Sequence, residues 1–125
     1  MSGVTLDAGP LIGLDRGNRR ILALIARAQE TQQPLFIPAT ALAQAMRNPA
    51  RQARLSRLVR QPRSVIVPLD RSTATATGLL LAESDTADIA DAHVVATARR
   101  LGTGIITSDP DDLRRLDPGI PLTEV

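Results

Sequence analysis

Three aspartates stand where their side chains could do chemistry. Asp7 ends an apolar run at residues 3–7, Asp109 follows one at residues 104–107, and Asp91 lies in a segment with helical periodicity. Carboxylates that converge repel one another unless cations neutralise them. Their oxygen ligands suit Mg²⁺ or Mn²⁺, which bind a few carboxylates together with water and phosphate. The three residues therefore predict a divalent-cation site.

Asp91 is the most informative of the three. In a helix over residues 87–101 it shares one face with Val94, Val95 and Ala98, which are apolar. Asp91 should therefore point toward the core. A buried carboxylate requires a cation or strong hydrogen bonds, because desolvation penalises its charge. We favour a metal site, and an ion pair with an arginine is the alternative.

The other acids have local structural alternatives. Asp88, one turn before Asp91, either joins the cation site or stabilises the start of the helix, with Asp85 as its N-cap. Asp109 also fits the N-cap position of a helix that begins at Pro110. For Asp109 a metal site is favoured because this residue, like Asp7, lies at the end of a predicted buried strand, whereas for Asp88 the two interpretations are equally supported.

Composition limits the kinds of site. The chain has 125 residues, which predicts one domain spanning residues 1–125. It has no cysteine, which excludes disulfides and thiolate-based metal sites. The single histidine, His93, lies off the Asp91 face, and we expect it to be partly exposed. Without a signal peptide or an apolar run long enough for a membrane span, we expect a cytoplasmic protein that does not enter the membrane.

The basic residues are all arginines, and they are unevenly distributed. Six of the 15 lie between Arg47 and Arg63, whereas acids gather in the second half of the chain. A basic stretch and an acidic cluster together suit a metal-dependent nuclease, in which one region binds phosphate and the other holds cations. Arg47, Arg51 and Arg54 are candidates for contacts with a phosphate backbone. A solvated helix face is the alternative.

Short apolar runs alternate with helical patterns along the chain. Residues 8–10 are predicted to be a turn after the first strand, and Asn18 is predicted to cap the first helix. The predicted strands are residues 3–7, 35–37, 64–67, 104–107 and 120–123, and the predicted helices are residues 21–28, 38–46, 50–60, 71–82, 87–101 and 110–116.

Strands separated by helices predict an α/β fold, a single-domain three-layer α/β/α sandwich with a central, mostly parallel sheet. Functional groups in such sheets gather at the carboxyl ends of the strands. Asp7 and Asp109 should therefore lie at the same edge. Thr107 and Ser108 follow the same strand and could hydrogen-bond a phosphate or a water in the site. Periodicity does not define the strand order.

Three acidic stretches, at residues 4–12, 88–95 and 107–113, resemble in this order the signatures of PIN domains. More narrowly, they resemble those of VapC-type toxins of bacterial type II toxin–antitoxin systems. The similarity covers almost the full chain. It implies a PIN-like α/β/α fold, Mg²⁺- or Mn²⁺-dependent endoribonuclease activity, a homodimer and neutralisation by a cognate antitoxin protein.

The resemblance also implies roles for single residues. Asp7, Asp91 and Asp109 match the first, third and fourth acids of the family, which makes them catalytic metal ligands. Asp112 would be a supplementary ligand.

The sequence departs from the family at the second acid. This acid is usually a glutamate, and Gln44 stands in its place. An amide brings no charge, so the metal affinity should be lower unless Asp88 compensates. A catalytically weakened or inactive PIN-like protein that binds RNA or a protein partner is therefore the main alternative. A phosphoryl-transfer receiver domain is disfavoured because the chain has no lysine.

Overall fold

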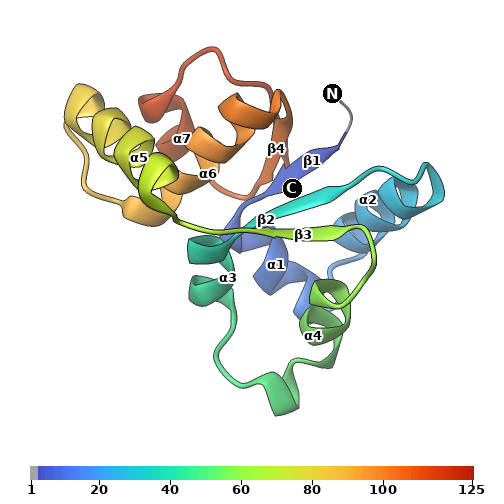
Figure 1. The fold of residues 1–125 in the computed structure, drawn as a ribbon. Coiled ribbons are helices and arrows are strands. Elements are labelled where there is room, and N and C mark those ends of the chain that lie inside the picture. The colour runs from blue at the N-terminus through green and yellow to red at the C-terminus, as the bar shows by residue number, and fades with distance from the viewer. Residues whose placement is uncertain (1–2) are drawn as a thin grey trace.

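A five-stranded parallel sheet forms the centre of the protein (Figure 1). The structure is a computed structural model and describes residues 3–125. The strand order is β3-β2-β1-β4-β5, and each neighbouring pair is parallel. The predicted fold class is therefore confirmed. The strands are β1 (Val4–Leu6), β2 (Leu35–Pro38), β3 (Ser64–Val67), β4 (Gly104–Thr107) and β5 (Leu122–Glu124).

Helices cover both faces of the sheet, which completes the three-layer sandwich. In Figure 1, α5, α6 and α7 lie above the sheet, and α1, α3 and α4 lie below it. This division follows from right-handed crossovers that run in opposite directions across the sheet, from β1 to β2 and from β3 back to β4. The helices are α1 (Ala8–Asp15), α2 (Arg19–Glu30), α3 (Ala39–Ala45), the 3₁₀ turn η1 (Pro49–Arg51), α4 (Ala53–Val59), α5 (Arg71–Ser84), α6 (Ile89–Leu101) and α7 (Pro110–Leu116).

Helix α6 is the most buried of the helices in residues 3–125. Its residues 92–98 are all buried, and it contacts β1, β2 and β4 as well as α3, α5 and α7. The strands beneath it contribute Leu6, Ile37 and Ile105, each at most 1% exposed. Burying one such side chain contributes about 1.5–3 kcal/mol. The helix that carries Asp91 is therefore held firmly in the core.

The predicted turn at residues 8–10 is wrong, because these residues form the first turn of α1. Pro10 is tolerated there because the first N–H groups of a helix have no partner within the helix. Asp7 is the N-cap, and its side chain accepts a hydrogen bond from the N–H of Ala8. The strand therefore passes directly into a helix, which fixes the position of this acid.

The predicted continuous helix over residues 50–60 is also wrong. Pro49–Arg51 forms a 3₁₀ turn, and α4 begins only at Ala53. The side-chain oxygen of Gln52 accepts two backbone N–H groups of the preceding loop, each at 2.7 Å. This side chain replaces the helical hydrogen bonds and holds a bend between η1 and α4.

Asn18 caps α2 as predicted, and its side-chain oxygen accepts the N–H of Ile21 at 3.1 Å. Within residues 3–125, no helix has both the length and the apolar character needed to cross a membrane.

Candidate functional site

The sheet order reverses between β1 and β4. From β1 the chain crosses to β2 and β3, and it then returns to the other side of β1 for β4 and β5. In open parallel sheets, such a switch point leaves a crevice at the carboxyl ends of the strands, where ligands bind. Asp7 directly follows β1, and Asp109 comes two residues after the end of β4. Both acids therefore lie at this edge, as expected.

Thr107 joins the ends of β1 and β4. Its hydroxyl donates to Asp7 Oδ2 at 2.7 Å and accepts the N–H of Asp109 at 2.9 Å. The other carboxylate oxygen, Asp7 Oδ1, accepts the N–H of Ala8 at 2.8 Å. Asp7 is 6% exposed and Thr107 is fully buried. These hydrogen bonds fix the orientation of the Asp7 carboxylate and the position of the Asp109 backbone.

The first turn of α1 packs closely against the loop that follows β4. A Cβ placed on Gly9 would lie 2.7 Å from Ser108 Oγ and 2.9 Å from Ser108 Cβ. Only glycine allows this approach without a shift of the loop that carries Asp109. Ser108 is exposed, and its supporting role in the site stays a prediction.

A cavity of about 230 Å³ opens between the start of α6 and α7. Asp88 and Asp91 line it from the start of α6, whereas Asp112 and Arg115 line it from α7. Asp91 is half-buried and lies one residue before a fully buried segment of α6. Three of the predicted acids thus share one solvent-accessible space, whereas Asp7 and Asp109 do not line it.

Asp91 is the most perturbed acid of the site. Burial, followed by the negative charges of the other four acids of the site, raises its pKa from 3.8 to about 7. These acids are Asp88, Asp7, Asp112 and Asp109. All five aspartates proposed from the sequence therefore lie within electrostatic reach of one another. A perturbed carboxyl in a cavity is typical of functional sites, because a stable core avoids uncompensated charge.

Two further acids are shifted in the same direction. Burial raises the pKa of Asp7, although the hydrogen bonds from Thr107 and Ala8 oppose this effect. Hydrogen bonding to Asp112 raises the pKa of Asp109, and burial and the charge of Asp112 add to the shift. The site therefore carries more negative charge than the protein itself neutralises.

The PIN domain family model matches residues 4–118. The chain belongs to the PIN domain family. Comparison with curated proteins gives no significant match.

Solved structures show the same PIN fold at low sequence identity. VapBC2 from Rickettsia felis, bound to a DNA fragment, gives a TM-score of 0.74 at 12% identity, with 98% of both chains covered. A toxin–antitoxin complex from Klebsiella pneumoniae gives 0.70 at 22% identity, covering 98% of this chain and 99% of the other. FitAcB from Neisseria gonorrhoeae gives a TM-score of 0.68 at 18% identity, covering 97% of this chain and 96% of the other.

The donor set of this PIN domain fits a hard divalent cation. Among residues 3–125, no three acidic or histidine side chains lie close enough together to enclose a metal ion. Mg²⁺ does not require such a cage, because it retains several waters and binds one or two carboxylates together with phosphate. Asp88, Asp91 and Asp112 present carboxylate oxygens to a water-accessible cavity, which matches that mode of binding.

The helix caps explain only part of the acidic pattern. Asp88, not Asp85, is the N-cap of α6 and accepts the N–H of Asp91 at 2.9 Å. Asp85 instead ends α5 in the left-handed region, with φ 54°. Asp109 occupies the N-cap position of α7, but its side chain accepts no capping hydrogen bond from any described residue. Capping therefore accounts for Asp88 but not for Asp109.

The expectation that His93 is partly exposed is wrong. His93 is fully buried, and its Nδ1 lies 2.7 Å from Thr40 Oγ1. Helical periodicity around Asp91 suggested one buried face, whereas α6 packs against elements on all sides. Burial lowers the pKa of His93 and so favours the neutral ring.

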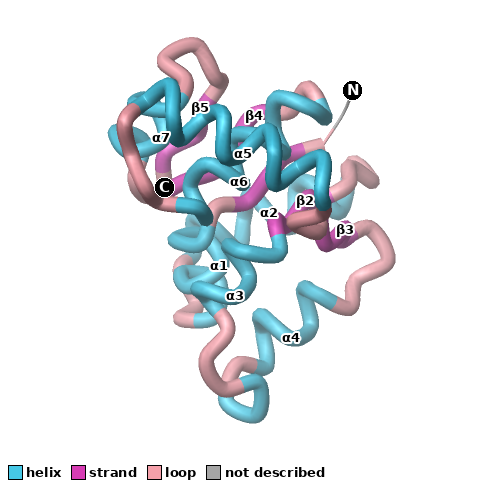
Figure 2. Tube along the Cα trace, turned by 60° about the vertical axis from the view of Figure 1, so that its left-hand side comes forward, coloured by secondary structure: helices cyan, strands magenta, loops and turns pink. Residues whose placement is uncertain are grey.

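Gln44 and the predicted phosphate-binding arginines lie outside the acidic cavity. Gln44 is exposed and lines a separate cavity of about 320 Å³, together with Asp15, Arg16 and Arg47. This placement offers no support for Gln44 as a direct substitute for a metal ligand. Figures 1 and 2 both place the α4 segment at the end of the molecule away from α7.

The guanidinium groups of these arginines are partly engaged by the protein. Arg47 Nη1 donates to the carbonyl of Ala43 at 3.0 Å, and Arg54 Nη1 donates to that of Asp15 at 3.2 Å. Arg51 is exposed on η1. Their contact with RNA stays a prediction.

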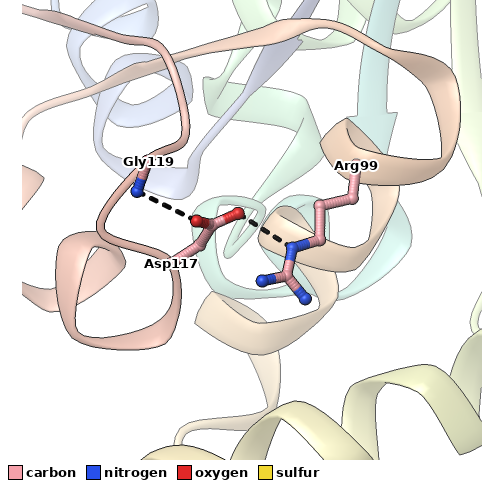
Figure 3. Close-up of polar contacts among 3 residues, drawn as sticks. All are labelled: Arg99, Asp117 and Gly119. Atoms are coloured by element: carbon pink, nitrogen blue, oxygen red, sulfur yellow. Dashed lines mark hydrogen bonds and ion pairs between the residues drawn. The ribbon is translucent and has the colours of Figure 1, made fainter.

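The sequence did not lead us to predict Arg115, the positively charged side chain that lines the cavity. Arg115 Nη1 lies 3.7 Å from Asp112 Oδ1, and both residues line the cavity. Their i,i+3 spacing on a predicted helix was the available signal, because residues three apart are neighbours on a helix. Arg99, which lies on α6, forms an ion pair with Asp117, and neither residue lines the cavity (Figure 3).

Proposed function

We propose that this PIN domain is a metal-dependent endoribonuclease and the toxin of a toxin–antitoxin pair. The observation that carries the enzymatic part is the cluster around Asp91, where five aspartates interact at the switch point of the sheet. Such a cluster destabilises the metal-free fold, so its natural complement is a divalent cation. Asp7, Asp91 and Asp109 are the proposed catalytic ligands, with Asp88 and Asp112 as supplementary ligands.

Each proposed ligand has a distinct task. Asp7 offers a carboxylate already oriented by Thr107 and the N–H of Ala8. Asp91 presents its carboxylate to the cavity from the start of a rigid helix. A bound Mg²⁺ or Mn²⁺ supplies Lewis acidity, which activates water for attack on phosphorus and neutralises charge that develops on the phosphate. Hydrolysis of RNA by this route leaves 5′-phosphate and 3′-hydroxyl ends.

RNA recognition would depend on shape and backbone. Phe36 is the only aromatic residue in the chain, so stacking platforms for bases are nearly absent from the sequence. Arg47, Arg51 and Arg54 are proposed to contact phosphates at a distance from the cleaved bond, because none of them lines the acidic cavity. Structured RNA, whose backbone geometry is fixed, suits such a surface better than a flexible single strand.

A neighbouring structure supports the proposal of a protein partner. One similar chain comes from a toxin–antitoxin complex from Klebsiella pneumoniae, which supports a cognate antitoxin as that partner. We also propose a homodimer and a cytoplasmic location, on the basis of the family resemblance.

The direct test is cleavage of structured RNAs with Mn²⁺, with Mg²⁺ and with EDTA. Cleavage that requires the cation and leaves 5′-phosphate ends is expected. Equal RNA integrity under all three conditions, over a panel of hairpins and tRNAs, would contradict the enzymatic proposal. Coexpression with the protein encoded beside it tests the toxin proposal separately, since growth arrest should occur only without that partner.

A PIN-like binding protein without turnover is the second candidate. It is favoured by the lack, within residues 3–125, of three acids close enough to enclose a metal, and by Gln44 in the second acidic position. A Mn²⁺ titration separates the candidates, because a binding module should show no site that depends on Asp7 and Asp91. Gln44→Glu adds a probe: a gain in metal affinity or activity supports a weakened enzyme, and no change opposes this placement of Gln44.

A further inference from the structure

Arg115 is the only cationic residue among the described residues that line the acidic cavity. It lies on α7 and shares the cavity with Asp88, Asp91 and Asp112. Its Nη1 is 3.7 Å from Asp112 Oδ1, which is longer than an ordinary hydrogen bond. The Arg115 side chain is 69% exposed and that of Asp112 is 43% exposed. The guanidinium therefore lies at the rim of the site and is weakly held.

The charge of the cavity creates a need for this cation. The carboxylates of Asp88, Asp91 and Asp112 line the cavity, so a phosphodiester that enters it meets up to three negative charges. One divalent cation offsets only two of them. A guanidinium at the rim can bind two phosphate oxygens at once, which positions the phosphate as well as attracting it.

We propose that Arg115 is a phosphate-binding residue that exchanges partners when substrate binds. In the free protein it pairs with Asp112. In the complex it binds a phosphate next to the cleaved bond, and Asp112 becomes available to the divalent cation. This inference rests on the proposed nuclease function and adds to it the residue that holds the substrate phosphate at the site.

The neighbouring pair provides a matched control. Arg114 Nη1 lies 3.6 Å from Asp111 Oδ1, with the same i,i+3 spacing on the same helix, but neither residue lines the cavity. The Arg114 side chain is 54% exposed. Substitutions at residues 114 and 115 therefore remove the same charge and a similar surface pair, and they differ in access to the site.

The experiment compares Arg115→Gln, Arg115→Lys and Arg114→Gln with the wild type. Binding of a fluorescein-labelled hairpin RNA is measured in Mn²⁺ over a range of salt, cleavage kinetics are measured with the same RNA, and Mn²⁺ affinity is measured without RNA. Arg115→Gln should raise KM and the RNA Kd about tenfold relative to Arg114→Gln, and it should lower the slope of log K against log salt by about 0.7. Arg115→Lys should restore the slope but only part of the affinity, since it keeps the charge and loses the bidentate geometry.

Mn²⁺ affinity distinguishes the proposed role from a structural one. Arg115→Gln should leave it unchanged or tighten it, because a competitor for Asp112 is removed. Equal KM values and salt slopes for Arg115→Gln and Arg114→Gln would overturn the proposal while wild-type cleavage persists. A weaker Mn²⁺ affinity with an unchanged salt slope would also overturn it. If the wild type neither binds nor cleaves the hairpin in Mn²⁺, the proposed nuclease function fails as well.

Discussion

Two aspartates near opposite ends of α6 occupy contrasting environments. Asp117 accepts Arg99 Nε at 2.8 Å and the N–H of Gly119 at 3.0 Å (Figure 3), and the hydrogen bond from Arg99 lowers its pKa. Asp91 lies at the start of the helix, where burial and neighbouring carboxylates raise its pKa to about 7. The fold supplies a counter-charge to one acid and places further acids beside the other.

This contrast separates a carboxylate that the fold neutralises from one that it leaves uncompensated. The Arg99–Asp117 pair holds the loop after α7 against the end of α6. The charge of Asp117 is therefore neutralised within the protein, without a bound ligand. The carboxylates around Asp91 repel one another in the free protein, and a bound proton or the proposed divalent cation would relieve that repulsion. An acid that the fold leaves uncompensated therefore indicates a ligand more strongly than the number of acids does.

The largest expected effect separates the two acids by activity. Asp91→Asn should reduce cation-dependent RNA cleavage by on the order of 100-fold or more, because it removes a ligand of the cation that stabilises the transition state. Asp117→Asn, the matched control, should leave cleavage within about twofold of the wild type, a ΔΔG‡ of under about 0.5 kcal/mol. Initial rates on one hairpin RNA at fixed Mn²⁺ measure both variants. Similar losses of activity in Asp91→Asn and Asp117→Asn would contradict a catalytic role that Asp91 has and Asp117 lacks.

The pH dependence of stability should also differ between the two acids. A carboxyl whose pKa is raised by folding binds protons more readily in the native state, so stability is lost as pH rises from 3.8 through about 7. Because Asp91 is half-buried and partly screened, the metal-free protein should lose about 2 kcal/mol of unfolding free energy over this window. Asp117 has a lowered pKa, so its contribution is lost only as pH falls below about 4.

Urea unfolding at about pH 5 and pH 8 in EDTA measures this difference. Asp91→Asn should flatten the dependence, and Asp117→Asn should preserve it. Mn²⁺ should reverse the trend, because its ligands must be deprotonated and it binds the native state. Stability that rises with pH in EDTA would contradict the assigned electrostatics of the site.

Local sequence patterns were sufficient for the strands, for most helices and for the acids at their ends, but not for α1 or for the break between η1 and α4. Asp7 and Asp109 could be placed at one edge because parallel strands share a direction, and Asp91 could be placed by helical spacing. The burial of His93 could not be predicted, because it depends on helices that pack on α6 from distant parts of the chain. The contact between Gly9 and Ser108 and the role of Thr107 as a link between strands also required the strand order.

An intermediate effect is expected where the protein orients an acid without neutralising it. Thr107→Val keeps the shape of the side chain but removes the donor to Asp7 and the acceptor for the N–H of Asp109. The loss of two buried hydrogen bonds should lower the unfolding free energy by about 1.5 kcal/mol. Cleavage should fall by roughly tenfold, since two proposed ligands lose their orientation. Thr107→Ser, which keeps the hydroxyl, should recover most of the activity, and a failure to do so would assign the effect to packing.

The smallest effect is expected at the Arg99–Asp117 pair, in which each charge already has a partner within the protein. Asp117→Asn should lower the unfolding free energy by only about 0.5–1 kcal/mol, because Arg99 is 48% exposed and its ion pair is screened by water. The loss should shrink further in high salt, whereas the stability gained by Asp91→Asn above pH 7 should persist because the cluster is less accessible to ions. A double-mutant cycle with Arg99→Gln isolates the pair energy. A coupling energy well above 1 kcal/mol would show that the Arg99–Asp117 pair stabilises the fold more than a solvent-screened ion pair does. Asp117 and Asp91 would then differ only in their effect on activity.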